Sequence, residues 1–437
     1  PKGSSTPSGR AAGQAGRGAR PCGSRSDALV SPSVSNDDGY KRRLLVFLSV
    51  ASFFEGYDFL ALSQLLPTLR DHFSLSKLEG GALVTVVNVG TMIAYLLVRG
   101  ADRWGRKRAL AVTIAGYTVA SLVSGLAPNV WLFAAAQLTA RVFLIAEWAI
   151  SLVIAAEEFP AAERGHAMGI IQASSSLGAI VCAGVVPLLL QLPWGWRTIY
   201  FVGAVPLVLV AFARRGMRET KRFEARAAGE PKAGFFDILR GPYRQRVLQV
   251  ALVWGLAYVC TQTAITFWKD FALKERNMTE GQAGLAITIA AVGALPLVFL
   301  AGKMLDVWGR RRSAVLIFIA TSTGTAGAYI FANQIGLTAA LTVAIFGTTA
   351  ILTVLNAYNA ELFPTAIRAD AFAWANNLLG RIGYVLAPVA VGWAAERTSW
   401  SVAVSATGIF PVIALGVILA RFPETRGKEL EETAATP

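Results

Sequence analysis

The chain carries little charge for its length. Only 16% of its 437 residues are Asp, Glu, Lys or Arg, whereas about a quarter is usual in a soluble domain. The apolar residues make up 54% of the chain and are gathered into long runs, and most of the charges lie between these runs. This distribution excludes an ordinary soluble protein and predicts a chain that crosses a membrane several times.

Histidine and cysteine are also scarce. The histidines are His72 and His166, and the cysteines are Cys22, Cys182 and Cys260. Their spacing suggests neither a metal site nor a disulfide framework, and the sequence has no Gly-rich phosphate loop and no catalytic triad pattern. We therefore expect no enzymatic activity, no metal ion and no other cofactor.

The net charge of +14 comes largely from short basic segments that flank the apolar runs. Anionic lipid headgroups lie at such positions in a membrane protein. No separate basic domain is present that would hold a nucleic acid duplex. The expected partner of this charge is therefore the lipid bilayer and not nucleic acid.

Twelve apolar segments follow a polar first stretch. Most are about 20 residues long, which matches a hydrocarbon core of about 30 Å at 1.5 Å per helical residue. The sequence therefore predicts an all-α membrane protein with twelve transmembrane helices. They are expected near residues 44–67, 79–99, 109–127, 130–156, 165–190, 197–214, 246–271, 280–301, 312–331, 337–360, 369–394 and 401–421.

Lysine and arginine are divided unevenly between the two sides of these helices. If the N-terminus is cytosolic, the inside segments hold 32 of the 41 basic residues and the outside loops hold 7. Because cytosolic loops carry an excess of Lys and Arg, both termini are expected in the cytosol. The expected location is the plasma (inner) membrane, and we expect a monomer.

The chain repeats itself after 204 residues, on either side of a basic loop. A constant offset across two separated motifs predicts two halves with one fold. The predicted parts are a disordered cytosolic tail 1–40, a six-helix half 41–215, a basic cytosolic linker 216–245, a six-helix half 246–422 and a cytosolic tail 423–437. The repeated residues are Asp102, Trp104, Gly105, Arg106, Arg108, Glu157, Phe159, Pro160 and Arg164, which recur as Asp306, Trp308, Gly309, Arg310, Arg312, Glu361, Phe363, Pro364 and Arg368.

These motifs resemble those of the major facilitator superfamily. The loop Asp102–Arg108 and its counterpart Asp306–Arg312 resemble the loop between helices 2 and 3 of that family. The segments Glu157–Pro160 and Glu361–Pro364 resemble the ends of helices 4 and 10 in sugar-porter-like members. The likeness covers about residues 40–430 and implies the major facilitator fold, with two pseudo-symmetric six-helix halves.

Shorter segments narrow the resemblance. Phe54–Asp58 resembles helix 1 of aromatic-acid and related metabolite:proton symporters, and Ala146–Trp148 is similar to helix 4 of sialate-type and metabolite-type symporters. Gly380–Gly383 is similar to helix 11 of organic-anion-type members. The resemblance implies proton-coupled uptake of a small organic anion, an aromatic or other monocarboxylate, by alternating access. Because Pro423–Gly427 resembles a sugar-porter element, a sugar:proton symporter is the alternative, followed by an exporter of small organic compounds.

Carboxyl groups inside the predicted helices are candidates for proton coupling. A charge within a bilayer is costly and is a functional hypothesis by default. Desolvation disfavours the charged form of a carboxyl group, so a group in a partly dry cavity can load and release a proton. We prefer Asp58, with Glu55 one turn earlier and Glu147 in the fourth helix as further candidates. The alternatives are a structural ion pair of Asp58 with Arg141 and a contact of Glu147 with Asn88.

Two arginines within the predicted helices are candidates for substrate binding, because a guanidinium matches the geometry of a carboxylate. Arg141 and Glu147 lie about 120° apart around a helix, so only one of them is expected to face a central cavity, and we prefer Arg141. Arg381 shares one predicted helical stripe with Trp374, Asn377 and Tyr384. The alternative for Arg381 is an ion pair with Asp58 or bonds to helix-end carbonyls.

The resemblance implies that helices 1, 4, 7 and 10 line the central path. Polar stripes in two of them are therefore candidate ligand contacts, and bonds between helices are the alternative. These candidates are Tyr258, Gln262, Asn356 and Asn359.

The resemblance further implies a cytosolic gate. Its glycines permit tight turns, its aspartates can sit at helix N-termini of the facing half, and its arginines and glutamates can pair across the gate in the outward-facing state. The alternative is a basic cluster that only sets orientation. The predicted gate residues are Asp102, Gly105, Arg106, Glu157, Arg164, Asp306, Gly309, Arg310, Glu361 and Arg368.

Overall fold

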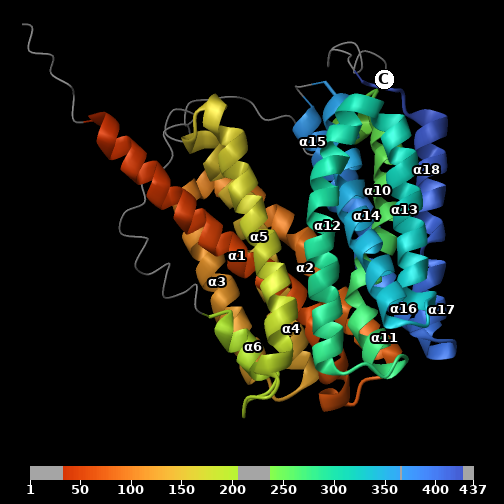
Figure 1. Ribbon diagram of the computed structural model, residues 1–437. Coiled ribbons are helices and arrows are strands. Elements are labelled where there is room, and N and C mark those ends of the chain that lie inside the picture. The colour runs from red at the N-terminus through yellow and green to blue at the C-terminus, as the bar shows by residue number, and fades with distance from the viewer. Residues whose placement is uncertain (1–32, 205–236, 365–366, 427–437) are drawn as a thin grey trace, which may run out of the picture. The chain divides into compact units, whose positions relative to one another are not determined.

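A computed structural model of the chain describes residues 33–204, 237–364 and 367–426, and the regular structure in these ranges is helical (Figure 1). Residues from Lys41 onwards form one compact unit. The packing described below is that of this unit. Most of the predicted tail 1–40 and of the linker 216–245 lies outside the described residues, so their predicted character stays a prediction.

The first half of the chain contains six described helices. They are α1 (Ser33–Phe73), α2 (Lys77–Trp104), α3 (Arg106–Leu126), α4 (Val130–Glu158), α5 (Ala161–Leu189) and α6 (Arg197–Val202). The helix α1 begins within the stretch predicted to be disordered, so that prediction is wrong for residues 33–40. Once the apolar part of α1 has nucleated a helix, each further residue costs little, which accounts for the extension. The predicted sixth span continues into residues 205–214, outside the described residues.

The second half contains longer helices interrupted by short ones. They are α9 (Asp237–Arg240), α10 (Arg244–Thr266), α11 (Trp268–Lys274), α12 (Glu280–Trp308), α13 (Arg310–Ile330), α14 (Gln334–Glu361), α15 (Arg368–Phe372), the π-helix η2 (Ala373–Gly380), α16 (Arg381–Arg397), α17 (Trp400–Ala406) and α18 (Ile409–Arg421). In the described ranges, 11 helical segments are long and apolar enough to cross a membrane. The predicted all-α, multi-pass membrane fold is confirmed.

The two halves begin and end their helices at corresponding residues. Asn129 and Asn333, 204 residues apart, cap α4 and α14 by accepting the backbone N–H three residues further on, at 2.9 and 2.8 Å. Gly105 and Gly309 end α2 and α12 with φ angles of 92° and 89°, a backbone region that favours glycine. These shared helix ends support the internal repeat seen in the sequence.

The compact unit has two ends that differ in how the halves meet. The ion-pair end carries the connections 74–76, 267–279 and 398–399, and the motif end carries Gly105 and Gly309. Near the ion-pair end, a Cβ on Gly81 of α2 would lie only 2.3 Å from the carbonyl oxygen of Pro388 in α16. The two halves therefore pack backbone against backbone there, as they can only where a side chain is absent.

Candidate functional site

A cavity of about 270 Å³ lies between the two halves. One wall comes from α1, α2, α4 and α5, and the other from α10, α12, α14 and α16. Most of the lining is apolar, which suits a small and mainly apolar ligand held by a few polar groups. The polar side chains in the lining are Ser63, Asn88, Arg141, Ser176, Thr261, Gln262, Thr266, Thr349 and Tyr384.

Arg141 is the one charged side chain among the described residues that line this cavity. It is only 6% exposed, and within the described part its Nη1 has no hydrogen-bond partner. Its guanidinium carbon lies 4.7 Å from the ring centroid of Phe59. A guanidinium with a free donor beside an aromatic ring can bind a carboxylate and contact the apolar body of the same ligand. Of Arg141 and Glu147 in α4, the structure thus places Arg141 at the cavity and not Glu147.

The three predicted proton-coupling carboxyl groups lie inside the first half, and none of them lines the cavity. Asp58, Glu55 and Glu147 are all buried, with 5%, 6% and 0% exposure. Glu55 accepts a hydrogen bond of 2.6 Å from the hydroxyl of Ser175 in α5, and Glu147 accepts one of 2.8 Å from Ser151 in α4. Three carboxyl groups and one guanidinium therefore share this buried region.

Asp58 is oriented away from the cavity. Its Oδ1 has no partner within the described residues and lies 3.8 Å from the place of a Cβ on Gly203, so it faces the end of α6. No ion pair joins it to Arg141 in the described part of the chain, although the charge of Arg141 acts on it. Its neighbour Phe59 lines the cavity and contacts Arg141, so the acid and the cavity are one residue apart.

Asn88 and Arg381 make contacts that differ from those considered for them in the sequence. The amide nitrogen of Asn88 lies 3.4 Å from the carbonyl oxygen of Tyr384 in the other half, and does not bond to Glu147. Arg381 does not pair with Asp58. Its guanidinium carbon lies against two aromatic rings, because the negative potential at the faces of the rings attracts a cation.

The stripe predicted in helix 11 is interrupted by the π-helix η2, which holds Trp374 and Asn377. A π-helix has wider turns than an α-helix, so residues spaced three or four apart no longer share one face. Arg381 lies 5.0 Å from the ring centroid of Tyr258 and 4.8 Å from that of Tyr384. Of the four predicted residues of the stripe, only Tyr384 lines the cavity.

Only part of the polar stripes predicted in helices 7 and 10 lines the cavity. Gln262 lines the cavity, whereas Asn356 and Asn359 lie close to the motif end of α14 and do not line it. Tyr258 donates its hydroxyl to Oδ1 of Asn376 at 2.7 Å. Sequence periodicity missed Asn376, because it cannot reveal the extra residue that a π-helix inserts.

Some residues that line the cavity could not be predicted from the sequence. Ser63, Ser176, Thr261 and Thr349 line the cavity, yet small hydroxyl residues are common in transmembrane helices and often bond to a carbonyl oxygen of their own helix.

Among the described residues, no group of His, Cys, Asp and Glu is arranged to hold a metal ion.

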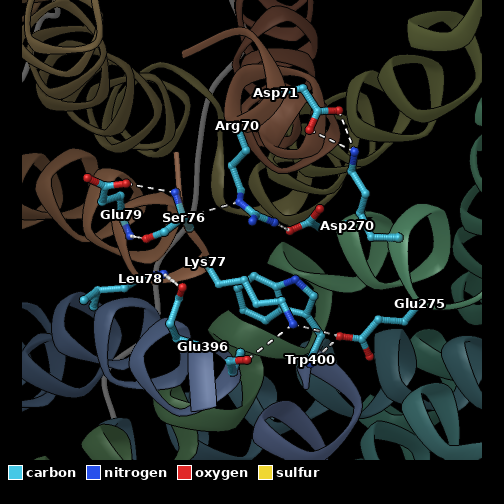
Figure 2. Close-up of polar contacts among 12 residues, drawn as sticks. Arg70, Asp71, Ser76, Lys77, Leu78, Glu79, Asp270, Glu275, Glu396 and Trp400 are labelled. Carbon is cyan, nitrogen blue, oxygen red and sulfur yellow. Dashed lines mark hydrogen bonds and ion pairs between the residues drawn. The ribbon is translucent and has the colours of Figure 1, made fainter. Parts of the chain in front are cut away.

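Ion pairs join the two halves at the ion-pair end (Figure 2). The pair Arg70–Asp270 is buried, with side-chain exposures of 13% and 0%. The pair Asp71–Lys274 is exposed, with side-chain exposures of 63% and 45%. Burial raises the pKa of the Asp270 carboxyl, and the guanidinium of Arg70 opposes this rise. The three pairs are Arg70–Asp270, Lys77–Glu275 with 3.2 Å between Nζ and Oε1, and Asp71–Lys274 with 2.6 Å between Oδ2 and Nζ.

Further polar contacts close this end. Glu275 also accepts the backbone N–H groups of Trp400 and Ser401 at 2.6 and 3.1 Å, which caps the N-terminus of α17. The backbone N–H of Leu78 donates to Glu396 at 3.0 Å (Figure 2). Because these contacts link α2, α11, α16 and α17, the ion-pair end is closed in this conformation.

At the motif end, the predicted gate residues pair within each half. Arg106 lies 3.4 Å from Glu157, and Arg310 lies 2.6 Å from Glu361. Each pair joins two helices of one half in this conformation. The pairs form within a half because each arginine begins a helix that packs beside the helix of its glutamate partner. The expectation that these groups pair across the gate concerns the outward-facing state, so it stays a prediction.

Among the other predicted gate residues, Gly105 and Gly309 form the expected tight turns, whereas the charged ones make different contacts. Asp306 is 77% exposed and lies 3.8 Å from Arg310 on its own helix, rather than at a helix of the facing half. Arg368 donates from Nε to the carbonyl oxygen of Phe363 at 3.3 Å. Nε of Arg164 has no partner within the described residues. The side chain of Asp102 lies outside the described part of the structure.

The sugar-porter-like element after the last helix caps α13. The carboxylate of Glu424 accepts the backbone N–H groups of Arg310 and Arg311 at 2.8 and 2.9 Å. Burial acts to raise the pKa of Glu424, but these backbone N–H groups and two more outweigh it, so the pKa lies below its usual value. Thr425 donates its hydroxyl to Glu361. This element therefore stabilises the N-terminus of α13, which begins with Arg310.

Comparisons with known proteins agree with this architecture. The sequence profile of the Major Facilitator Superfamily matches residues 48–274 and 250–437. The chain is 30% identical over 392 residues to the probable 4-methylmuconolactone transporter of Cupriavidus pinatubonensis, covering 86% of this chain and 89% of that protein. It is 24% identical to the putative niacin/nicotinamide transporter NiaP of Bacillus subtilis, over 90% of this chain and 98% of that one.

A solved structure also has the same fold. The crystal structure of a D-xylose-proton symporter aligns with a TM-score of 0.70 and 19% identity, covering 89% of this chain and 99% of that chain. The profile match spans both halves, and the fold is that of a multi-pass membrane transporter and not of an enzyme. The chain belongs to the major facilitator superfamily.

Proposed function

We propose that the chain is a proton-coupled symporter that takes up a small organic anion, an aromatic or other monocarboxylate, by alternating access. The observation that carries the proposal is Arg141, a buried guanidinium with a free donor beside Phe59 in the cavity wall. A hydroxyl group of a neutral sugar could accept from this donor, but it would leave the buried guanidinium without a counter-charge, which is unfavourable. The names of the two relatives, which describe transporters of small organic molecules, support the same function.

The proposed proton site is Asp58. An ionised Asp58 would reduce the positive potential of Arg141 and repel an anion in the cavity, and protonation would remove both effects. Proton and anion then each raise the affinity of the other by the same factor. Glu55 and Glu147 are the next candidates, since they share the same buried region.

The proposed transport cycle uses the two ends as alternating gates. The excess of basic residues supports a cytosolic motif end, and in that orientation the conformation with a closed ion-pair end faces inward. Opening outward would break the three ion pairs there. The same argument supports cytosolic termini, and we propose a plasma-membrane location and a monomer as the working unit.

Uptake into proteoliposomes tests the proposed function. With an inward pH gradient of one unit and one proton per anion, 4-carbamoylbenzoate should accumulate by about tenfold. Protein-free liposomes correct for diffusion of the uncharged acid. Accumulation of glucose, with none of the carboxylate, would favour the sugar:proton alternative. Uptake of neither solute would contradict the proposal.

Cysteine labelling tests the proposed orientation. In a chain with its three native cysteines replaced, a Glu230→Cys variant should react with a membrane-impermeant maleimide only after the cells are permeabilised. Ile335→Cys is the matched control, because Ile335 is 83% exposed at the ion-pair end and should react in intact cells. The opposite labelling pattern would show that the chain is inserted the other way round.

The buried ion pair at the ion-pair end should hold this end closed. Asp270→Asn leaves Arg70 buried without a counter-charge, and removing one partner of such a pair costs about 3–5 kcal/mol. In a Ser63→Cys background without native cysteines, labelling of the cavity from the outside should therefore accelerate at least tenfold, as roughly 1.4 kcal/mol already gives that factor.

Lys274→Gln is the control for this variant. It breaks only the exposed pair with Asp71, and exposed pairs contribute about 0–1 kcal/mol. Its labelling rate should change less than about fivefold. Equal acceleration by Asp270→Asn and Lys274→Gln would mean that burial of the first pair has no part in closing this end.

A further inference from the structure

The polar groups of the cavity are distributed unequally between its two walls. The wall from the first half contributes a guanidinium, Arg141. The wall from the second half contributes the hydroxyl or amide groups of Thr261, Gln262, Thr266, Thr349 and Tyr384, and no described residue of that wall is charged. The cavity thus has one cationic side and one side that is polar and neutral.

The second intramembrane arginine does not change this balance. Arg381 is not part of the cavity lining, and its guanidinium carbon lies 5.0 and 4.8 Å from the ring centroids of Tyr258 and Tyr384. In this conformation one positive charge, and not two, is available to a ligand.

Gln262 is the residue of the neutral wall with the greatest hydrogen-bonding capacity. Its amide nitrogen lies 3.4 Å from the hydroxyl of Thr266, and that hydroxyl donates to the main-chain oxygen of Gln262 at 2.6 Å. These bonds hold the amide in place and leave its oxygen and one N–H for a ligand. An amide can bond a hydroxyl, carbonyl or carboxamide group, but it cannot neutralise a carboxylate.

We propose that the site selects monoanions that carry a neutral polar group opposite the carboxylate, and that it rejects dicarboxylates, with Gln262 setting this selectivity. The inference rests on the proposed function, because it takes Arg141 as the carboxylate partner. A second carboxylate would enter a wall without a counter-charge, and burying an unpaired charge is strongly unfavourable. A neutral group of the same shape meets no such cost.

An isosteric pair of probes tests this selectivity on the unmodified protein. 4-Carbamoylbenzoate and terephthalate have the same shape and differ by one charge at neutral pH, since benzoate-type carboxyl groups ionise near pH 4. Titration calorimetry of the purified full chain at pH 7.5 should show terephthalate binding at least about 100-fold more weakly than 4-carbamoylbenzoate. Benzoate serves as the probe without a second polar group and should bind with an intermediate affinity.

A charge introduced into the neutral wall should reverse the preference. Gln262→Arg supplies a second guanidinium, so terephthalate should bind the variant at least about tenfold more tightly than 4-carbamoylbenzoate. Gln334→Arg is the matched control, because it adds the same charge at an exposed residue of the ion-pair end, outside the cavity. The control should keep the preference of the unmodified protein.

The outcomes separate this inference from the proposed function. If none of the three carboxylates binds, the proposed function fails, and the inference fails with it. If benzoate binds and terephthalate binds as tightly as 4-carbamoylbenzoate, the anion function stands and the selectivity is refuted. Loss of terephthalate binding in Arg381→Ala would then identify Arg381 as the second cation. Should Gln262→Arg fail to fold, the comparison of probes on the unmodified protein still decides.

Discussion

An Asp58→Asn variant is expected to lose proton-driven accumulation and to keep exchange. The asparagine has nearly the shape of a protonated aspartate but cannot release a proton. In the proposed cycle, the proton gradient acts only through this release, so the accumulated anion should fall from about tenfold per pH unit to about onefold. Binding and counterflow should persist, because the repulsion of the anion by an ionised Asp58 is also removed.

The measurement is uptake and counterflow of 4-carbamoylbenzoate in proteoliposomes with and without a pH gradient. Glu163→Gln is the control, since it neutralises an exposed carboxyl group in the first turn of α5. It should accumulate the anion as the unmodified chain does. If Asp58→Asn still concentrates the anion, proton coupling lies elsewhere, and Glu55→Gln and Glu147→Gln are the next variants to measure.

The pH dependence of binding gives a second test of Asp58. Because an anion should bind better when Asp58 is protonated, its affinity should rise as the pH falls, until the ligand's own carboxyl group takes up a proton near pH 4. In Asp58→Asn this dependence should vanish above that pH. An unchanged pH profile in the variant would assign the coupling to another group.

The parts of this fold that the sequence predicts are those that depend on long or repeated patterns. Apolar runs of about 20 residues identify membrane spans because the bilayer thickness fixes their length. The offset of 204 residues identifies the two halves, and the structure repeats the same helix ends at Gly105 and Gly309. A charge within an apolar helix identifies Arg141 as a candidate site residue, and it does line the cavity, whereas the same criterion also selects Asp58 and Glu147, which do not.

The parts that the sequence does not predict depend on geometry across helices. The π-helix η2 shifts the face on which Asn376 and Arg381 lie, and no residue pattern announces such an insertion. Asp58 faces α6 and not the cavity, which depends on how α1 is rotated against its neighbours. The buried pair of Arg70 with Asp270 joins residues 200 positions apart, and sequence patterns carry no information about such a contact.

Removing the guanidinium at the cavity should abolish most of the anion binding. Truncating one partner of a buried, hydrogen-bonded charge pair costs about 2–5 kcal/mol. Arg141→Ala should therefore weaken 4-carbamoylbenzoate binding by roughly 30-fold to several thousand-fold. Arg141→Lys should recover little of it, because an ammonium lacks the planar fork that bonds a carboxylate twice.

An Arg381→Ala variant distinguishes the contribution of Arg381 to anion binding from that of Arg141. The guanidinium of Arg381 contacts the rings of Tyr258 and Tyr384 and does not line the cavity. A cation–π contact contributes about 0.5–2 kcal/mol, so the affinity for 4-carbamoylbenzoate should change by less than about 30-fold. Calorimetry on both alanine variants at one pH gives the comparison. If Arg381→Ala loses binding and Arg141→Ala retains it, the carboxylate is held by helix 11, and the charge that Arg141 presents to the cavity serves another purpose.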